Sequence, residues 1–382
     1  MLIYNTAELD NALIRQEADD AKAAGVIVQG TAERIKAAHP YTLYSPNIFV
    51  RIGLGLATVL CVLLATGLFF LLMMDGAIRS IEIFFLVWGV LAYGTLEMWM
   101  SGHRHYRSGV DDGLTWVSAV YIAGALVALM ENDSPVLLFI LLTALASWYT
   151  VRTSDPGIAL CGWVCGIMIV VYGAIAYIPG ARYLLPFLVM GISAGAYLLF
   201  TRIQRNFRFR HYDLCLDVLR LGTLATLYLA GNYYVVHIAG MELLGMEGEP
   251  PLPWLFWTLS IAIPPVYIWM GLLRKDRIPL AMGLILIAMA VFTIRAYHAV
   301  MPIETAMVLG GIFLVGVSYF VHRYLKKPKH GFTTEAMHTR SFGAQQLEGL
   351  IIAETMQPTP QAGEAFQFGG GSGGGGGASN EF

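Results

Sequence analysis

The sequence predicts an all-α membrane protein with about ten transmembrane helices. Only 13% of the 382 residues are charged and 57% are hydrophobic, whereas charged residues make up about 25% of an average soluble domain. The apolar residues gather into runs of roughly 17 to 28 positions, which as helices cross about 30 Å of hydrocarbon. Because backbone polar groups in lipid must be paired within their own segment, these runs favour helices over open strands.

Charge and cysteine content argue against several classes of protein. The formal net charge of −2 lacks the basic surplus of nucleic-acid binders, so we expect no nucleic-acid partner. Cys161 and Cys165 share one helix face without a second pair of ligands, which favours packing over metal or redox chemistry. The first 48 residues lack the basic start and apolar core of a cleaved signal peptide, so we expect the first span to remain as an anchor.

Residues 1–48 predict a cytoplasmic helical hairpin. Residues 6–24 are rich in Ala, Leu, Asp and Glu and precede a glycine, and a second run over 31–38 ends at a His-Pro pair. The apolar runs then follow one another to the end of the last span. The predicted spans are 49–74, 80–100, 113–130, 134–151, 157–178, 183–201, 213–239, 253–273, 278–298 and 303–324.

The basic residues predict the orientation of these spans. Short cytoplasmic loops carry an excess of Lys and Arg, and one set of alternate loops holds ten such residues while the other holds only Arg79 and Arg182. Both ends of the chain fall on the basic side, where Lys326, Lys327 and Lys329 follow the last span. We therefore expect a bacterial inner-membrane protein with both termini in the cytoplasm. The ten residues are Arg104, Arg107, Arg152, Arg202, Arg205, Arg208, Arg210, Arg274, Lys275 and Arg277.

Three pairs of segments recur in the same order and indicate an internal duplication. They predict a four-span repeat over 113–205 and a second over 206–326, preceded by two spans and a loop over 49–112. Repeats of four spans share one topology and are parallel. The alternative is that apolar segments resemble one another by composition alone. The paired segments are 104–124 with 210–231, 152–160 with 274–281, and 191–205 with 311–326.

Few ionisable residues lie deep in the predicted spans, where each is costly. Glu97 lies near the cytoplasmic end of its span, close to Arg104 and His105. Asp217 and Arg220 are three positions apart on one helix face and can form an ion pair. A static pair and a site for a proton or coupling ion are both compatible with this spacing.

A second polar group is predicted toward the outer side of the membrane. It combines side chains of the seventh, ninth and tenth predicted spans, and an arginine on this side is unusual. If the side chains converge, they line a polar pocket open to the outside; the alternative, that each is explained by snorkelling or helix capping, is favoured. The residues are Asn232, His237, Arg295, His298 and Glu304.

The sequence offers no positive case for an enzyme or a cofactor. His103 and His105 lie in a loop and lack the further ligands that a metal or haem site requires. The phosphate-binding loop, the nucleophile elbow and the zinc-protease motif are missing. We expect no bound metal or cofactor. Pro264 and Pro265 interrupt one span, either as a packing kink or as a break at a substrate site.

Some segments resemble known groups of proteins. Residues 291–295 and 324–332 resemble uncharacterised multi-pass membrane proteins of Bacteroidetes-type bacteria, and 47–53 is similar to multi-pass proteins grouped as a membrane domain of unknown function. The polar tail over 327–382 becomes nearly all glycine at 369–377, and 368–382 resembles the tails of TPM-domain membrane proteins, which often accompany LemA-type proteins. These resemblances imply a membrane-associated partner and carry over no functional residue.

The sequence thus supports three hypotheses on function. The first is a non-enzymatic scaffold or envelope-associated partner, which lies in the lipid bilayer and binds a membrane protein through its hairpin or tail. The second is a secondary transporter or channel with a polar site between the repeats. The third is an intramembrane enzyme. Convergence of the polar residues on a water-accessible cavity would favour transport over scaffolding.

Overall fold

A computed structural model of the chain confirms the all-α membrane class. It describes residues 2–73, 80–102, 105–131, 134–246 and 248–297, with isolated helical positions between 305 and 323. Nine helices in this part of the chain are long and apolar enough to cross a membrane. Their outward side chains are mostly large and apolar, as expected for contact with a lipid bilayer. The chain is therefore a multi-pass membrane protein.

The helices follow one another through short connections. A hairpin of two helices precedes the spans, and one short 3-10 helix, η1, leads into α9. The helices are α1 (Thr6–Ala23), α2 (Gln29–Ala38), α3 (Ile48–Met73), α4 (Ile81–Gly102), α5 (Val110–Leu129), α6 (Pro135–Thr153), α7 (Pro156–Tyr177), α8 (Ala181–Gln204), η1 (Phe207–Tyr212), α9 (Asp213–Gly231), α10 (Tyr233–Leu244), α11 (Pro253–Arg274) and α12 (Arg277–Tyr297).

These bounds match the predicted spans except at the seventh. There the apolar run over 213–239 predicts one helix, whereas the structure has two helices that separate at Asn232. Asn232 has an extended backbone and its side chain accepts a hydrogen bond from Val235 N, so it caps α10. The predicted tenth span, 303–324, lies almost wholly outside the described residues, as does the tail over 327–382.

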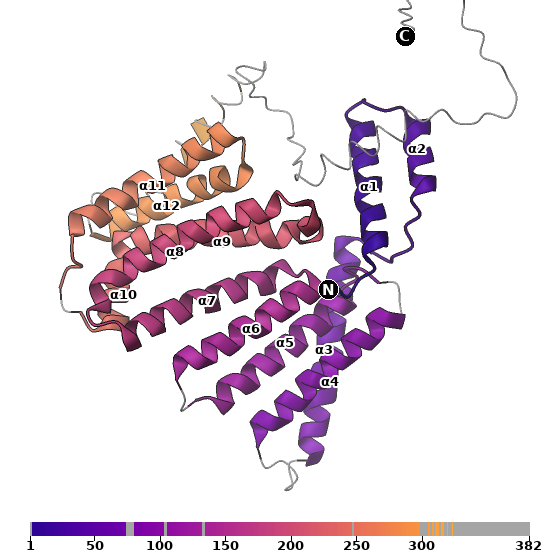
Figure 1. The fold of residues 1–382 in the computed structure, drawn as a ribbon, viewed down its shortest axis with the longest axis horizontal. Coiled ribbons are helices and arrows are strands. Elements are labelled where there is room, and N and C mark those ends of the chain that lie inside the picture. The colour runs from indigo at the N-terminus through magenta and orange to yellow at the C-terminus, as the bar shows by residue number, and fades with distance from the viewer. Residues whose placement is uncertain are drawn as a thin grey trace, which may run out of the picture.

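The spans form a fan of helical hairpins. In Figure 1 they spread in chain order from α3 and α4 at one edge to α11 and α12 at the other. The most extensive contacts join α4 to α5, α6 to α7, α8 to α9 and α11 to α12, while α3 also packs on α5 and α7 on α9. α1 and α2 stand beyond the ends of α7, α8 and α9 and run crosswise to these three helices (Figure 1).

Glycine allows α3 and α5 to approach closely at the start of α5. Gly109 precedes α5 with φ +96°, a conformation that side chains with a Cβ rarely adopt. A Cβ at this position would also collide with the carbonyl oxygen of Arg51 in α3. The absence of a side chain at Gly109 therefore sets the distance between the two helices.

Two connections at the basic ends of the spans have the same geometry. Ser154, between α6 and α7, and Lys275, between α11 and α12, are both left-handed, with φ of 55° and 53°. In each connection the next residue is an aspartate, and its side chain accepts a hydrogen bond from a backbone N–H of the following helix: Asp155 from Ile158 at 2.9 Å, and Asp276 from Ile278 at 3.1 Å. The two turns that the sequence comparison paired thus fold alike.

Candidate functional site

Asp217 and Arg220 of α9 belong to one half-buried charged cluster, which we call the Arg220 cluster. The side chain of Arg220 is only 7% exposed. Its Nη1 donates to Gln204 at 2.9 Å, and its Nη2 donates to Asp276. Gln204 in turn donates from Nε2 to Asp217 at 2.7 Å. The guanidinium also lies 5.5 Å from the ring centroid of Tyr197.

The main partner of Arg220 differs from the one that the sequence spacing suggested. Asp217 lies 3.8 Å from Nη1 of Arg220, the outer limit of an ion pair. Asp276, from the turn between α11 and α12, makes the direct charged hydrogen bond. This residue is 56 positions away from Arg220 in the sequence, so helix-face spacing could not identify it. The cluster ties the start of α9 to the α11–α12 turn.

Asn232 lies in a second polar group, fully buried at the other end of α9. Its amide Nδ2 donates to Tyr228 Oη at 3.0 Å and to Thr293 Oγ1 of α12 at 2.8 Å. Tyr228 donates to the carbonyl of Ser260 at 3.3 Å. Pro264 lacks the N–H that would otherwise bind this carbonyl within α11. The group therefore supplies hydrogen bonds to backbone groups that Pro264 and the break between α9 and α10 would otherwise leave unpaired.

Of the other predicted outer residues, His237 is the best defined. Its Nδ1 shares a hydrogen bond of 2.5 Å with Tyr297 Oη, and its ring lies 5.9 Å from that of Tyr233. Arg295 lies half-buried in the last turn of α12. His298 and Glu304 lie outside the described residues.

The predicted polar residues thus form two groups rather than one site. Asp217 and Asn232 are 15 positions apart in the sequence and stand at opposite ends of α9, about 22 Å apart at the usual helical rise. In each group the polar side chains mainly form hydrogen bonds or ion pairs that join the helix ends around them. A single cavity that joins them is not found among the described residues.

The sequence did not identify a polar junction at the basic ends of α3, α5 and α6. Asp111 is fully buried and accepts hydrogen bonds from Tyr4 Oη at 2.8 Å and from the backbone N–H groups of Arg107 and Ser108 at 2.8 Å each. Burial and the charge of Asp111 raise the pKa of the Tyr4 hydroxyl well above its ordinary value. The tyrosine therefore stays protonated and keeps donating to the carboxylate.

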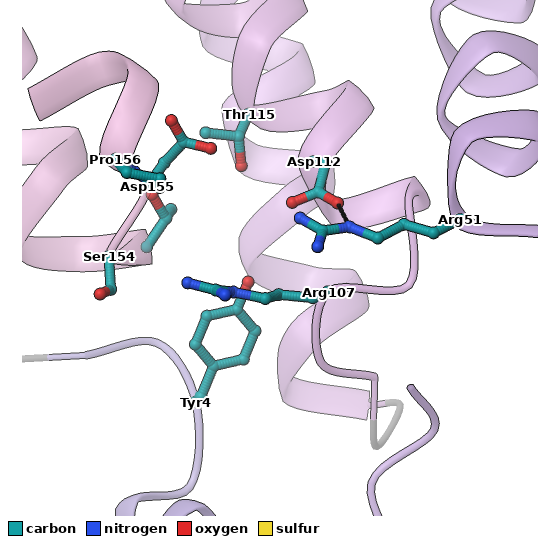
Figure 2. Close-up of a pocket in the computed structure, with 9 residues that line it drawn as sticks. Tyr4, Arg51, Arg107, Asp112, Thr115, Ser154, Asp155 and Pro156 are labelled. Carbon is teal, nitrogen blue, oxygen red and sulfur yellow. Dashed lines mark hydrogen bonds and ion pairs between the residues drawn. The ribbon is translucent and has the colours of Figure 1, made fainter. Parts of the chain in front are cut away.

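Next to Tyr4 lies a small polar pocket, drawn in Figure 2. Arg51 points at Asp112 and donates to it at 2.6 Å, while Arg107 extends past Tyr4 toward Ser154. The free volume is about 10 Å³, room for about one water molecule. We interpret the pocket as a junction of helix ends rather than as a ligand site.

Glu97 of α4 makes further polar contacts near the basic ends of the spans. Arg152 of α6 binds both of its carboxylate oxygens, at 2.7 and 2.6 Å, and Tyr93 donates to it at 2.7 Å. The predicted neighbour His105 instead lies against the rings of Tyr44 and Trp99. Arg104 lies outside the described residues. Glu97 thus joins α4 to α6 as a bidentate ion pair.

The one large cavity that we found in the described residues has different chemistry. It lies between α7, α8, α9 and α10, has a volume of about 340 Å³ and is lined almost wholly by apolar side chains. His237 is its only ionisable lining residue. Sequence analysis could not predict it, because it depends on the direction that α10 takes after Asn232. We call it the α10 cavity.

The described residues contain no group of three or more His, Cys, Asp or Glu side chains that could hold a metal ion. Comparison with known proteins gives no matching family model, no significantly similar curated protein and no significantly similar solved structure. Function is therefore inferred from the geometry of the chain itself.

Proposed function

We propose that the protein is a non-enzymatic scaffold of a bacterial inner membrane, with α1 and α2 as its cytoplasmic binding surface for a partner protein. The observation that carries this proposal is the attachment of the hairpin to the spans. A hairpin that only linked the first span to solvent would need no fixed contact with distant spans. A binding surface gains from a fixed orientation, because less ordering is then needed when a partner binds.

The hairpin contacts spans that are far apart in the sequence. Tyr4 donates to Asp111 at the start of α5, and the backbone N–H of Ile3 donates to the carbonyl of Arg152 at 2.9 Å. Asp10 accepts two hydrogen bonds of 2.6 Å from Arg210 in η1. Four hydrogen bonds, two of them within the Asp10–Arg210 ion pair, thus hold α1 and the residues before it against α5, α6 and η1.

The hairpin itself is a folded unit. Ile14 and Ala18 of α1 and Ile35 of α2 form a small core against which Phe207 of η1 packs. Arg15 donates to the carbonyl of Lys36 at 2.8 Å, which ties the end of α2 to α1. The hairpin is therefore fixed internally as well as to the spans.

The tip of the hairpin offers an apolar contact surface. Val26 and Val28 flank Ile27 in the turn after Gly25 and are 76% and 72% exposed. Apolar side chains exposed on an otherwise polar element are typical of protein contact sites. The polar tail over 327–382 is a second segment through which the same partner can bind.

The scaffold is inferred to contain two parallel repeats. The close packing of α6 on α7 in the first repeat, matched by that of α11 on α12 in the second, supports the duplication. The common geometry of the Ser154–Asp155 and Lys275–Asp276 turns supports it further. Both turns then lie on the cytoplasmic side, as the basic residues predict.

Co-purification of cross-linked partners tests the scaffold. Asp10→Ala removes the link to Arg210 and is expected to lower partner recovery several-fold, and Val26→Ser with Val28→Ser is expected to do the same. Asp19→Ala is the matched control, because the ion pair of Asp19 among the described residues is with Lys36, inside the hairpin. Equal recovery from all of these variants, at equal levels in the membrane, would refute the proposal.

Secondary transport is the second candidate, and the Arg220 cluster favours it. The Nε of Arg220 is buried without a hydrogen-bond partner among the described residues, so the cluster has a donor that a bound anion or a rearranged carboxylate could use. Proton flux into liposomes containing the purified protein tests this function. Flux that Asp217→Asn abolishes would support transport, and absence of flux in the unmodified protein would count against it.

A further inference from the structure

The α10 cavity exists because of the helix break at Asn232. α9 ends at Gly231, and α10 starts in a new direction, held by the cap of Asn232 on Val235 and by the bond from Asn232 to Thr293. The outer halves of α7 and α8 form the opposite wall, and the segment from Met246 to Pro251 closes one end. A continuous α9 would remove one wall of this space.

The lining offers few polar groups to a ligand. Thr226 already shares a hydrogen bond with Ser193 at 2.9 Å and donates to the carbonyl of Gly222 at 3.0 Å. His237 uses its Nδ1 for the hydrogen bond with Tyr297. The remaining walls are aliphatic, for example Ile167 and Val189. A polar ligand would lose its hydration with little compensation here, whereas a hydrocarbon chain would not.

The position of the cavity determines which hydrocarbon is available. Its walls belong to membrane spans and to the short helix that follows one, and Met246, Gly248, Pro250 and Pro251 of the next connection close one end. The cavity is not enclosed, and Val164 in its lining is 44% exposed, so a lipid chain on the outside of the bundle can reach it. Its volume is near the lower end of the roughly 300–1,000 Å³ typical of ligand pockets, which suits one chain rather than two.

We propose that the α10 cavity is a binding site for one acyl chain of a bilayer phospholipid. The chain enters between α7 and α10, and its contacts replace those that an empty apolar cavity lacks. The headgroup remains at the membrane surface, near the segment that follows α10. This site is independent of the scaffold function and of the hairpin.

Photo-crosslinking of the unmodified, full-length protein is the first test. A phospholipid with a diazirine near the end of one acyl chain is added to the protein in detergent, and labelled peptides are mapped by mass spectrometry. Labels at α7 and α10 residues that line the cavity, such as Met168 and Ala239, are expected. Labels confined to the outer faces of α3 or α11 would overturn the proposal.

A competition experiment distinguishes the source of the chain. Unlabelled phospholipid is expected to abolish cavity labelling at lower concentration than a free fatty acid of the same chain length. If only the fatty acid competes, the phospholipid assignment is wrong. If neither competes, the labelling is not specific and the site does not exist.

Filling the cavity is the second test. Ala239→Phe places a ring in the cavity and is expected to reduce phospholipid retained through gel filtration by roughly fivefold or more. Ala281→Phe on the exposed face of α12 makes the same change outside the cavity and is expected to leave retention unchanged. Equal retention in both variants would overturn the proposal. If Ala239→Phe fails to fold, the crosslinking experiment on the unmodified protein is the deciding test.

Discussion

Charged side chains of the spans are paired mainly with residues distant in the sequence. Glu97 pairs with Arg152, Arg51 with Asp112 and Arg220 with Asp276. Such pairs limit the cost of placing charges near hydrocarbon, and they also fix which helix ends meet. Removing one partner is therefore expected to cost more than removing an exposed charge.

Tyr4→Phe tests the attachment of the N-terminal segment. The change removes the hydroxyl that donates to Asp111 at 2.8 Å, while the backbone donors to Asp111 remain. The free energy of unfolding is expected to fall by about 1.5–3 kcal/mol, the usual contribution of a hydrogen bond to a charged group. Thermal unfolding in detergent measures it, and an unchanged midpoint would contradict the contact.

The raised pKa of Tyr4 also predicts a pH dependence. In the folded protein Tyr4 holds its proton more tightly than in the unfolded chain, so its contribution to stability is complete below the ordinary tyrosine pKa of about 10 and is lost as pH rises above it. The difference in unfolding midpoint between the unmodified protein and Tyr4→Phe should therefore shrink as pH is raised beyond this value. A constant difference would show that Tyr4 does not titrate with folding.

Asp276→Ala tests the Arg220 cluster. It leaves the buried guanidinium without its closest carboxylate, and the expected loss is about 3 kcal/mol in the free energy of unfolding. Combining it with Arg220→Met is expected to restore much of that loss, because no unpaired charge then remains. Chemical unfolding of the single and double variants measures both values. Additive losses would mean that the two side chains do not interact.

The helices themselves were largely predictable and their breaks were not. The length and apolarity of a run determine a span, so nine of the predicted spans correspond to helices in the described residues. The break at Asn232 escaped prediction because the residues after it, such as Tyr234 and Val235, are also apolar. Its cause includes Thr293, which is 61 positions away in the sequence.

The candidate site could likewise be predicted only where its contacts lie within one helix. Spacing along one helix placed Asp217 next to Arg220, but it could not show that Asp276 and Gln204 complete the cluster. Nor could it show that Asn232 and Asp217 face different sets of helices. Contacts within one helix turn can be inferred from the spacing of residues in a sequence. Contacts between helices depend on how the helices pack and cannot be inferred in this way.

Gly109→Ala tests the close approach of α3 and α5. The new Cβ would meet the Arg51 carbonyl and force an unfavourable backbone conformation, so a loss of about 3 kcal/mol or more is expected. Gly124→Ala is the control within α5, since no atom lies within 4 Å of the added Cβ there. Thermal unfolding compares the two. Equal stability of both variants would exclude a tight contact at Gly109.

Topology of the whole bundle can be tested by cysteine labelling. In a background without the four native cysteines, Arg208→Cys and Lys275→Cys should react with an impermeant reagent only after the membrane is opened, because both exposed positions lie on the basic side. Glu249→Cys, exposed in the segment after α10, should react in intact cells. The reverse pattern would invert the proposed orientation.

The bond between Asp10 and Arg210 joins residues 200 positions apart. Since translation proceeds from the N-terminus, the ribosome makes α1 long before it makes η1. At roughly 5–20 residues per second, α1 waits about 10–40 seconds for this contact. During that interval the aspartate and the small apolar core that Phe207 later covers are open to chaperones, so the hairpin reaches its final contacts only after η1 has been made.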